Sequence, residues 1–226
     1  MKDKTIKILS NIIVFQIYYL FPYIFSYLIE LFNINLSSFN KFIVMTILYA
    51  IEFIPVLFMI IIYRKDLKLE FKIFKENFIK NIDKYIRLWI FALFLMSISN
   101  MLITYITGSN ISNNEEVVRS MADMLPIYSI ITSSIFAPIV EELAYRKTIG
   151  NIFINKKLAI VMSGLVFGLA HVIGTYSTIL DLLYIIPYGL FGAVFMYIYL
   201  DSKNIYTTIT IHAFHNALLL IMYFIR

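Results

Sequence analysis

The sequence predicts an all-α fold, a polytopic bundle of transmembrane helices. Hydrophobic residues make up 61% of the 226 residues, charged residues make up 15%, and the mean hydropathy is +0.82. This composition is too apolar for a soluble globular protein of the same length. Long apolar runs recur along the whole chain, and a helix of about 20 residues crosses the hydrocarbon core of a bilayer.

About seven runs are long enough, or nearly so, to span the membrane. They are expected at 8–32, 42–63, 86–107, 126–147, 158–174, 179–200 and 205–225. The first run is longer than the apolar part of a signal peptide and lacks a small-residue cleavage site, so we expect it to be an uncleaved span. The chain has no cysteine, which excludes disulfides, cysteine proteolysis and thiolate metal sites.

The polar segment at about 64–87 has the pattern of a basic amphipathic helix. Its large apolar residues recur at helical spacing at Leu67, Phe71, Phe74 and Phe78. We expect this apolar face to lie in the headgroup layer on the cytoplasmic side, with the lysines facing anionic lipid. A solvated linker is the alternative.

The distribution of basic residues predicts the topology. Seven spans that start in the cytoplasm place all of the 19 basic residues on the cytoplasmic side except Lys41, Arg119 and Arg226. The positive-inside rule favours this orientation, so we expect a multi-pass protein of the cell membrane with a cytoplasmic N-terminus and an external C-terminus. The same distribution explains the net charge of +5 without a nucleic-acid partner, and the lipid bilayer is the expected partner.

Two adjacent carboxylates and an arginine lie inside the fourth run, at Glu141, Glu142 and Arg146. A charged side chain costs about 2.5 to 3.5 kcal/mol at the centre of a membrane helix, so such residues usually indicate chemistry, an ion path or a buried pair. The spacing of four between Glu142 and Arg146 permits an ion pair. The alternative is a hydrated helix end with a snorkelling arginine. Glu52 is a further intramembrane carboxylate, equally consistent with a partner of the site and with a structural hydrogen-bonding group.

All three histidines lie in apolar runs. Phe167 and His171 are four residues apart and share one helix face, on which Gly164 and Gly168 allow another backbone to approach closely.

His212 and Asn216 share a face of the last run in the same way. His215 lies about 60° around the helix from His212 and is consistent with lining the same cavity, capping a network or packing.

One carboxylate, two imidazoles and a carboxamide are sufficient to activate a water molecule and to stabilise an oxyanion, which predicts amide hydrolysis. A glutamate with two histidines is also a zinc-binding set. The sequence lacks the motifs of three other protease classes: His-Glu-x-x-His of zinc proteases, Gly-x-Ser-x-Gly of serine hydrolases and Gly-x-Gly-Asp of intramembrane aspartyl proteases.

The three motifs together resemble those of the CPBP intramembrane proteases (CAAX protease and bacteriocin-processing, or Abi). They occur in the family's order, as Glu141-Glu142-x-x-x-Arg146, Phe167-x-x-x-His171 and His212-x-x-x-Asn216. The resemblance implies that residues 126–226 are the catalytic core. Residues 1–125 would supply N-terminal transmembrane helices together with the basic cytoplasmic segment at about 64–87, and the two parts would form one integral membrane domain.

The resemblance implies an intramembrane endopeptidase that acts on a membrane-associated peptide or membrane-anchored protein. Glu141 would activate water with assistance from His171, and His212 and Asn216 would hold the oxyanion. The supporting residues would be Glu142, Arg146 and Phe167, the last as packing that shapes the cavity wall.

This mechanism requires no cofactor. The alternative is a divalent metal such as zinc, held by Glu141, His171 and His212. Bacteriocin self-immunity, peptide maturation and protein maturation are the expected roles. A non-enzymatic bacteriocin immunity or scaffold protein is the second hypothesis, and a proton-coupled transporter is the third.

Overall fold

The computed structural model describes residues 2–35 and 38–226, and all regular secondary structure within these ranges is helical, which confirms the all-α prediction. The helices are α1 (Lys2–Leu31), α2 (Lys41–Thr107), α3 (Asn113–Met124), α4 (Pro126–Ile131), α5 (Ala137–Glu141), α6 (Ile149–Ile152), α7 (Lys156–Val172), α8 (Ile185–Ser202) and α9 (Ile205–Phe224). Between them lie two π-helical segments, η2 (Thr132–Phe136) and η3 (Glu142–Thr148), and the 3-10 helix η4 (Ile179–Tyr184).

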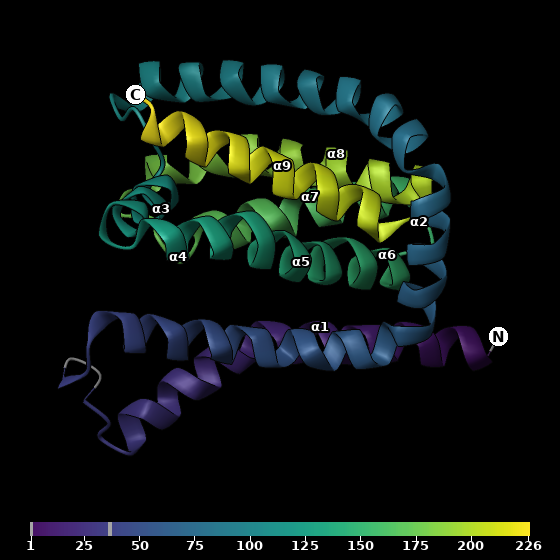
Figure 1. The fold of residues 1–226 in the computed structure, drawn as a ribbon, viewed down its shortest axis with the longest axis horizontal. Coiled ribbons are helices and arrows are strands. Elements are labelled where there is room, and N and C mark those ends of the chain that lie inside the picture. Colours follow the sequence, from purple (N-terminus) through teal and green to yellow (C-terminus); the bar gives the residue numbers. More distant parts are fainter. Residues whose placement is uncertain (1, 36–37) are drawn as a thin grey trace.

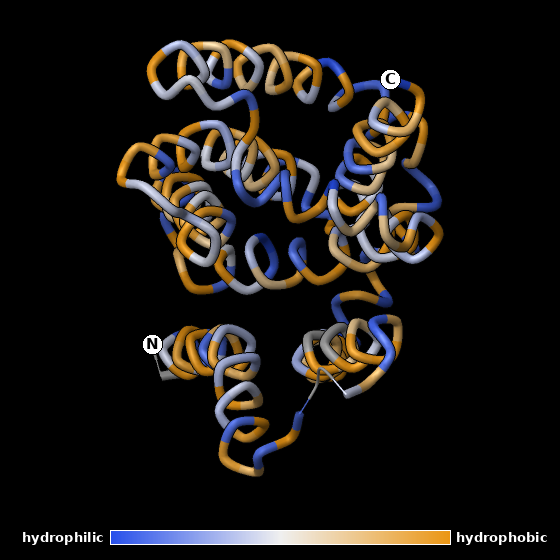
Figure 2. Tube along the Cα trace, turned by 90° about the vertical axis from the view of Figure 1, so that its left-hand side faces the viewer, coloured by the Kyte–Doolittle hydropathy of each residue, from blue (hydrophilic) through white to orange (hydrophobic). Residues whose placement is uncertain are grey.

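Five helical runs in the described chain are long and apolar enough to cross a membrane. They are Lys4–Leu31, Phe53–Thr107, Pro126–Ile152, Ile179–Ser202 and Ile205–Phe224. Apolar residues predominate along the helices in Figure 2. The expected count of seven spans stays a prediction, because α2 joins two of the expected spans in one helix and α7 has only 17 residues.

Helix α2 differs most from the sequence-based expectation, because it continues through both spans and the polar segment between them. Its 67 residues correspond to about 100 Å at 1.5 Å per residue, far more than a bilayer's thickness. Figure 1 shows how it fits: α2 follows one side of the bundle, crosses its end and returns along the opposite side. No proline or glycine interrupts the chain between Val56 and Thr107, and Gly108 ends the helix in the left-handed conformation (φ 73°).

The segment that crosses the end of the bundle is anchored by a buried carboxylate. Glu70 accepts a hydrogen bond from the Ile205 backbone N–H at 2.7 Å and from the Lys147 ammonium group. The Asn204 side chain donates to the Glu70 carbonyl at 2.6 Å. The polar segment is therefore attached both to the start of α9 and to η3.

Some residues of the apolar face expected on this segment are buried in the protein, and others are exposed on its surface. Leu67 is buried in the protein core, whereas Phe71 and Phe78 are exposed. Phe71 also packs against Tyr206, with ring centroids 5.2 Å apart. Only part of the expected face is therefore free to lie among lipid headgroups.

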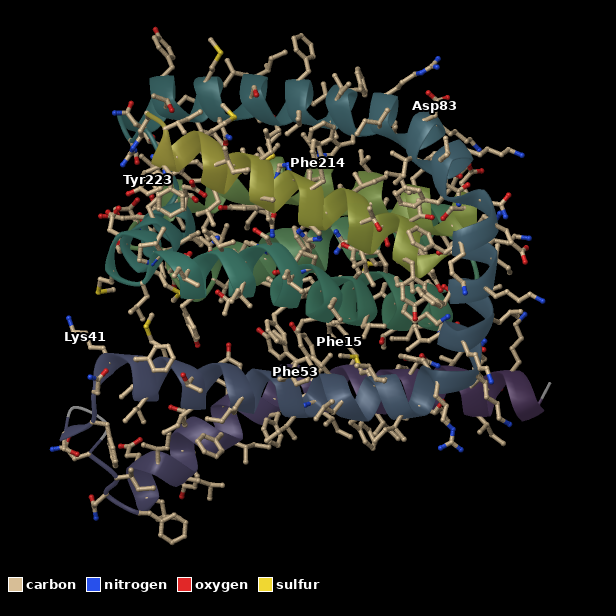
Figure 3. All side chains as sticks on the ribbon, in the orientation of Figure 1. Phe15, Lys41, Phe53, Asp83, Phe214 and Tyr223 are labelled. Atoms are coloured by element: carbon tan, nitrogen blue, oxygen red, sulfur yellow. The ribbon has the colours of Figure 1, made fainter. Side chains whose placement is uncertain are left out.

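Helix α1 and the first part of α2 form a layer beside the helices of residues 126–226 (Figure 1). Aromatic side chains fill the space between the two, as Phe15 and Phe53 show in Figure 3. Phe15 packs on Tyr145 with ring centroids 6.2 Å apart, and Phe53 packs on Phe136 at 5.3 Å. The N-terminal layer therefore supports the helical run Pro126–Ile152 from behind.

Helices α7 and α8 approach each other closely at two glycines. A Cβ atom on Gly164 would lie 2.6 Å from the Gly189 carbonyl oxygen, and one on Gly168 would lie 2.6 Å from the Ile185 carbonyl oxygen. Both distances are too short for a real side chain. The close backbone approach predicted beside His171 is therefore present.

Candidate active site

The four residues predicted to be catalytic line one cavity of about 500 Å³. Glu141 is the last residue of α5, and His171 lies in the last turn of α7. His212 and Asn216 both project from α9. The structure therefore brings together side chains from three helices that are far apart in the sequence.

Glu141 is the carboxylate that faces this cavity. Its Oε2 atom lies 3.6 Å from His212 Nε2 and 3.9 Å from His171 Nε2. Both separations exceed a direct hydrogen bond, and Glu141 Oε2 has no hydrogen-bond partner among the described protein atoms. These separations leave no room for a water molecule directly between the atoms, but a water in the cavity can contact Glu141 and both imidazoles from the side.

Glu142 faces the protein interior, although it is adjacent to Glu141 in the sequence. Its side chain is fully buried, and its Oε1 atom lies 2.8 Å from His212 Nδ1. Because a carboxylate only accepts hydrogen bonds, this contact places a proton on Nδ1 and fixes the orientation of the ring. Glu142 thus directs His212 Nε2 toward Glu141.

Arg146 compensates the buried charge of Glu142. Its Nε atom lies 3.3 Å from Glu142 Oε2, and both side chains have 0% exposure. The guanidinium group also lies over the Phe167 ring, 4.4 Å from its centroid, and 5.5 Å from the Phe195 centroid. The structure contains the expected ion pair rather than a snorkelling arginine. Phe167 does more than shape a wall, because its ring also stabilises the cation.

His171 is held between two aromatic rings and a backbone carbonyl. Its Nδ1 atom lies 2.9 Å from the Phe167 carbonyl oxygen, which makes Nδ1 the protonated nitrogen of the neutral ring. The imidazole stacks on Tyr188, with centroids 4.7 Å apart and an interplanar angle of 25°. The lone pair of Nε2 is therefore available on the side of Glu141.

Asn216 is oriented by a carbonyl group that the π-helical segment η2 releases. Its Nδ2 atom donates to the Ser133 carbonyl oxygen at 2.8 Å. The N–H of Ala137 binds the Thr132 carbonyl instead of that of Ser133, and the next residue, Pro138, has no N–H. The Ser133 carbonyl therefore needs a partner from outside its own helix, and the Asn216 carboxamide supplies it.

His215 lines the same cavity without touching either carboxylate. It is 96% buried and packs on Phe191, with ring centroids 4.2 Å apart, and on Trp89. The side chain of Glu52 lies outside the part of the chain whose side chains the structure describes.

Sequence reasoning missed two contributors to the site: Tyr188 and the Ser133 carbonyl. Pro138 signals a missing backbone donor, but at α-helical spacing that donor would have served the Ser134 carbonyl, and only the π-helical turn transfers the loss to Ser133. Nothing in the local sequence distinguishes Tyr188 from the chain's many other tyrosines.

Glu141, His171 and His212 are the residues that would hold a divalent metal ion, although within residues 2–35 and 38–226 no group of three or more His, Cys, Asp or Glu side chains has the geometry of a formed metal site. The Nδ1 atoms of His171 and His212 contact a carbonyl and a carboxylate, and both Nε2 atoms face Glu141. A carbonyl or carboxylate partner at one ring nitrogen is common for histidines that bind a metal through the other nitrogen. A bound metal would supply Lewis-acid activation of water at this position.

Comparisons with known proteins show what the second half of the chain is similar to. Residues 123–218 match the family model "Type II CAAX prenyl endopeptidase Rce1-like". The chain is 30% identical over 135 residues to YdiL of Bacillus subtilis (strain 168), a protein named as a membrane peptidase, and 30% identical over 158 residues to the membrane-embedded CAAX protease MroQ of Staphylococcus aureus (strain USA300).

The two alignments cover 58% and 63% of this chain, and 52% and 60% of the relatives' own lengths. No solved structure matches the chain significantly. The matched segment contains all three motifs and the cavity side chains that they supply. The family resemblance is thus confirmed: residues 123–218 of this chain match the Rce1-like type II CAAX prenyl endopeptidases.

Proposed function

We propose that this protein is an intramembrane endopeptidase that hydrolyses a peptide bond in a membrane-associated peptide or protein, using a water molecule activated by Glu141. The observation that best supports the proposal is the meeting of Glu141, His171 and His212 at one cavity inside an apolar bundle. The family match and the two membrane-protease relatives point to the same class of reaction.

The first step is attack by water on the scissile carbonyl carbon. Glu141 takes a proton from the water as the oxygen–carbon bond forms, and the carbonyl oxygen becomes an oxyanion. His171 assists through Nε2, which is free to hold a proton because Nδ1 is occupied by the Phe167 carbonyl. The carbon–nitrogen bond then breaks, the proton passes to the leaving amine, and the products are a carboxylate and an amine.

His212 and Asn216 stabilise the oxyanion. In this step a doubly protonated His212 ring donates from Nδ1 to Glu142 and from Nε2 to the oxyanion. Asn216 uses one N–H to bind the Ser133 carbonyl, which leaves its second N–H for the substrate. Both donors are fixed before the substrate enters, which is the arrangement that lowers the barrier most.

The substrate is a peptide or a membrane-anchored protein that reaches the site from the bilayer. Self-immunity to a bacteriocin and maturation of a peptide or protein are the cellular roles that this activity would serve. The name of one relative, a membrane-embedded CAAX protease, makes a farnesylated CAAX peptide a useful probe alongside unmodified peptides.

The test is hydrolysis by the purified protein in lipid nanodiscs. A proteome-derived peptide library and a farnesylated CAAX peptide are incubated in water enriched in heavy oxygen, and new termini are identified by mass spectrometry. We expect the label in new carboxyl termini, no cleavage by Glu141→Gln, and a rate about 10² to 10³ lower for Asn216→Ala. The matched control is Glu30→Gln, the same substitution at an exposed position at the end of α1.

Cleavage by Glu141→Gln at the wild-type rate would overturn the glutamate mechanism. Activity that a chelator removes and zinc restores would replace it with a metal mechanism at Glu141, His171 and His212. If the wild type cleaves nothing while Glu141→Gln retains the cellular phenotype, the immunity or scaffold hypothesis takes its place.

A further inference from the structure

A second, smaller cavity of about 220 Å³ adjoins the catalytic cavity. The two share a wall made of Met96, Glu115, Arg119, Tyr188, His215 and Leu219. The Tyr188 ring lines both cavities and stacks on the His171 imidazole, so it separates this smaller chamber from the catalytic histidine. At about 3.4 Å per extended residue, a substrate bound at Glu141 places a neighbouring side chain within reach of the chamber.

Unpartnered polar side chains line this chamber. His215 is 96% buried, and its Nδ1 atom has no hydrogen-bond partner in the described part of the chain. Asn100 is partly buried and Ser97 is exposed, and neither makes a side-chain hydrogen bond to the described residues. A buried polar group without a partner is costly, so His215 needs a hydrogen bond from water or from a ligand. The chamber is therefore equipped to meet a polar group that the protein itself does not provide.

The rest of the lining is partly aliphatic and partly polar, with Asn110, Ser112 and Tyr184 among the polar members, and its charged residues are paired. Leu93, Pro187 and Leu219 contribute aliphatic surface. The charged residues on the shared wall neutralise each other, since Arg119 Nε lies 2.8 Å from Glu115 Oε1. The volume corresponds to roughly seven water molecules, which is suitable for one large side chain. These properties favour an uncharged aromatic side chain with a polar tip over a charged or purely aliphatic one.

We propose that this chamber is a specificity subsite that accepts a tyrosine or tryptophan side chain of the substrate within about two residues of the scissile bond. The proposal rests on the proposed peptidase function and adds the substrate class to it. Asn100 and His215 would bind the hydroxyl or indole N–H, and the aliphatic walls would enclose the ring. Neither residue takes part in bond cleavage.

The experiment is cleavage-site profiling with the same peptide library in nanodiscs. The wild type should show one position near the scissile bond enriched in tyrosine and tryptophan. Ser97→Trp fills the chamber and should remove this enrichment while peptides with small residues at that position are still cleaved. Met101→Trp is the matched control: it introduces the same side chain four residues further along α2, at a position that is 72% exposed and outside both cavities.

Asn100→Leu keeps the approximate size of the side chain and removes its hydrogen bonds. We expect it to lower the ratio of kcat/KM for a tyrosine peptide over the matched phenylalanine peptide about tenfold, which is the size of one net hydrogen bond. An unchanged ratio in Asn100→Leu, together with an unchanged profile in Ser97→Trp, would overturn the subsite. A uniform loss of rate in Ser97→Trp, independent of the peptide sequence, would also overturn it and assign the chamber to water supply or folding. Absence of cleavage by the wild type would instead contradict the proposed function.

Discussion

His212 joins the two adjacent carboxylates of the first motif, with Nδ1 at 2.8 Å from Glu142 and Nε2 at 3.6 Å from Glu141. The imidazole separates two glutamates with different surroundings: Glu142 is fully buried, and Glu141 keeps 19% of its side chain exposed. Of these two consecutive glutamates, Glu142 therefore supports His212 from the protein interior, and Glu141 faces the cavity.

Glu142→Gln should lower the cleavage rate about 10- to 100-fold, as loss of a group that orients a functional histidine typically does. The glutamine keeps the shape but removes the charge at His212 Nδ1. The measurement is a double-mutant cycle with His212→Ala, in which Glu142→Gln should have little further effect once the imidazole is absent. Fully additive effects of the two substitutions would show that Glu142 acts independently of His212.

Arg146→Leu should destabilise the protein more than Glu141→Gln does. Removing the guanidinium leaves Glu142 buried without its partner, at a cost of about 3 to 5 kcal/mol. Thermal unfolding in nanodiscs and abundance in the membrane measure the effect. Arg119→Leu is the control, because its ion pair has the same i,i+4 spacing but is partly exposed, which limits its loss to about 0.5 kcal/mol. Equal stability of all three variants would contradict a structural role for the buried pair.

Gly164→Ala and Gly168→Ala should each destabilise the protein by about 1 to 3 kcal/mol, because the added methyl group meets a backbone carbonyl of α8. Gly174→Ala makes the same chemical change where no atom lies within 4 Å, so its melting temperature should match that of the wild type. Equal melting temperatures for all three glycine variants would show that α7 and α8 can move apart to accommodate a methyl group.

A tag after Arg226 should be accessible from outside the cell, and a tag at the N-terminus only after the cytoplasmic side is opened. The basis is the concentration of basic residues on one side. The fold agrees with this segregation. Figure 1 shows the two termini at opposite ends of the bundle, and the segment 64–87 crosses the end at which the N-terminus lies. Lys41 lies at the other end in Figure 3. Accessibility of both tags from the same side would require an even number of spans.

The sequence predicts the helical fold and most helix ends because their signals are local. Apolar runs, the glycine after Thr107 and the asparagines before α7 and α9 act over a few residues. The meeting of Glu141, His171 and His212 was implied by the family resemblance, because helical spacing relates residues within one helix and only permits convergence between helices. The partner of His212 was not, because Glu142 is as close to Glu141 in the sequence as two residues can be, and only tertiary packing decides which one faces inward.

The π-helical segments and the continuity of α2 were beyond sequence reasoning for a related reason. A π turn depends on a competition between backbone hydrogen bonds that differ little in energy, and packing decides the outcome. In α2, the polar composition of 64–87 indicated a separate element, although no residue there stops a helix. The charged residues of 64–87 indicate where the chain leaves the apolar core. They do not indicate whether the helix ends there.

The anchoring of α2 through Glu70 has a consequence for the order of assembly during synthesis. The carboxylate that holds the crossing segment is made early, whereas Lys147 follows 77 residues later and Ile205 follows 135 residues later. A nascent chain can therefore form the long helix from local hydrogen bonds alone, but its crossing segment gains the contact to η3 only after Lys147 is made and the contact to α9 only after Ile205 is made. Chains that are truncated before Ile205 and released from the ribosome should therefore be cleaved by protease within residues 64–87. The full-length chain should resist cleavage there.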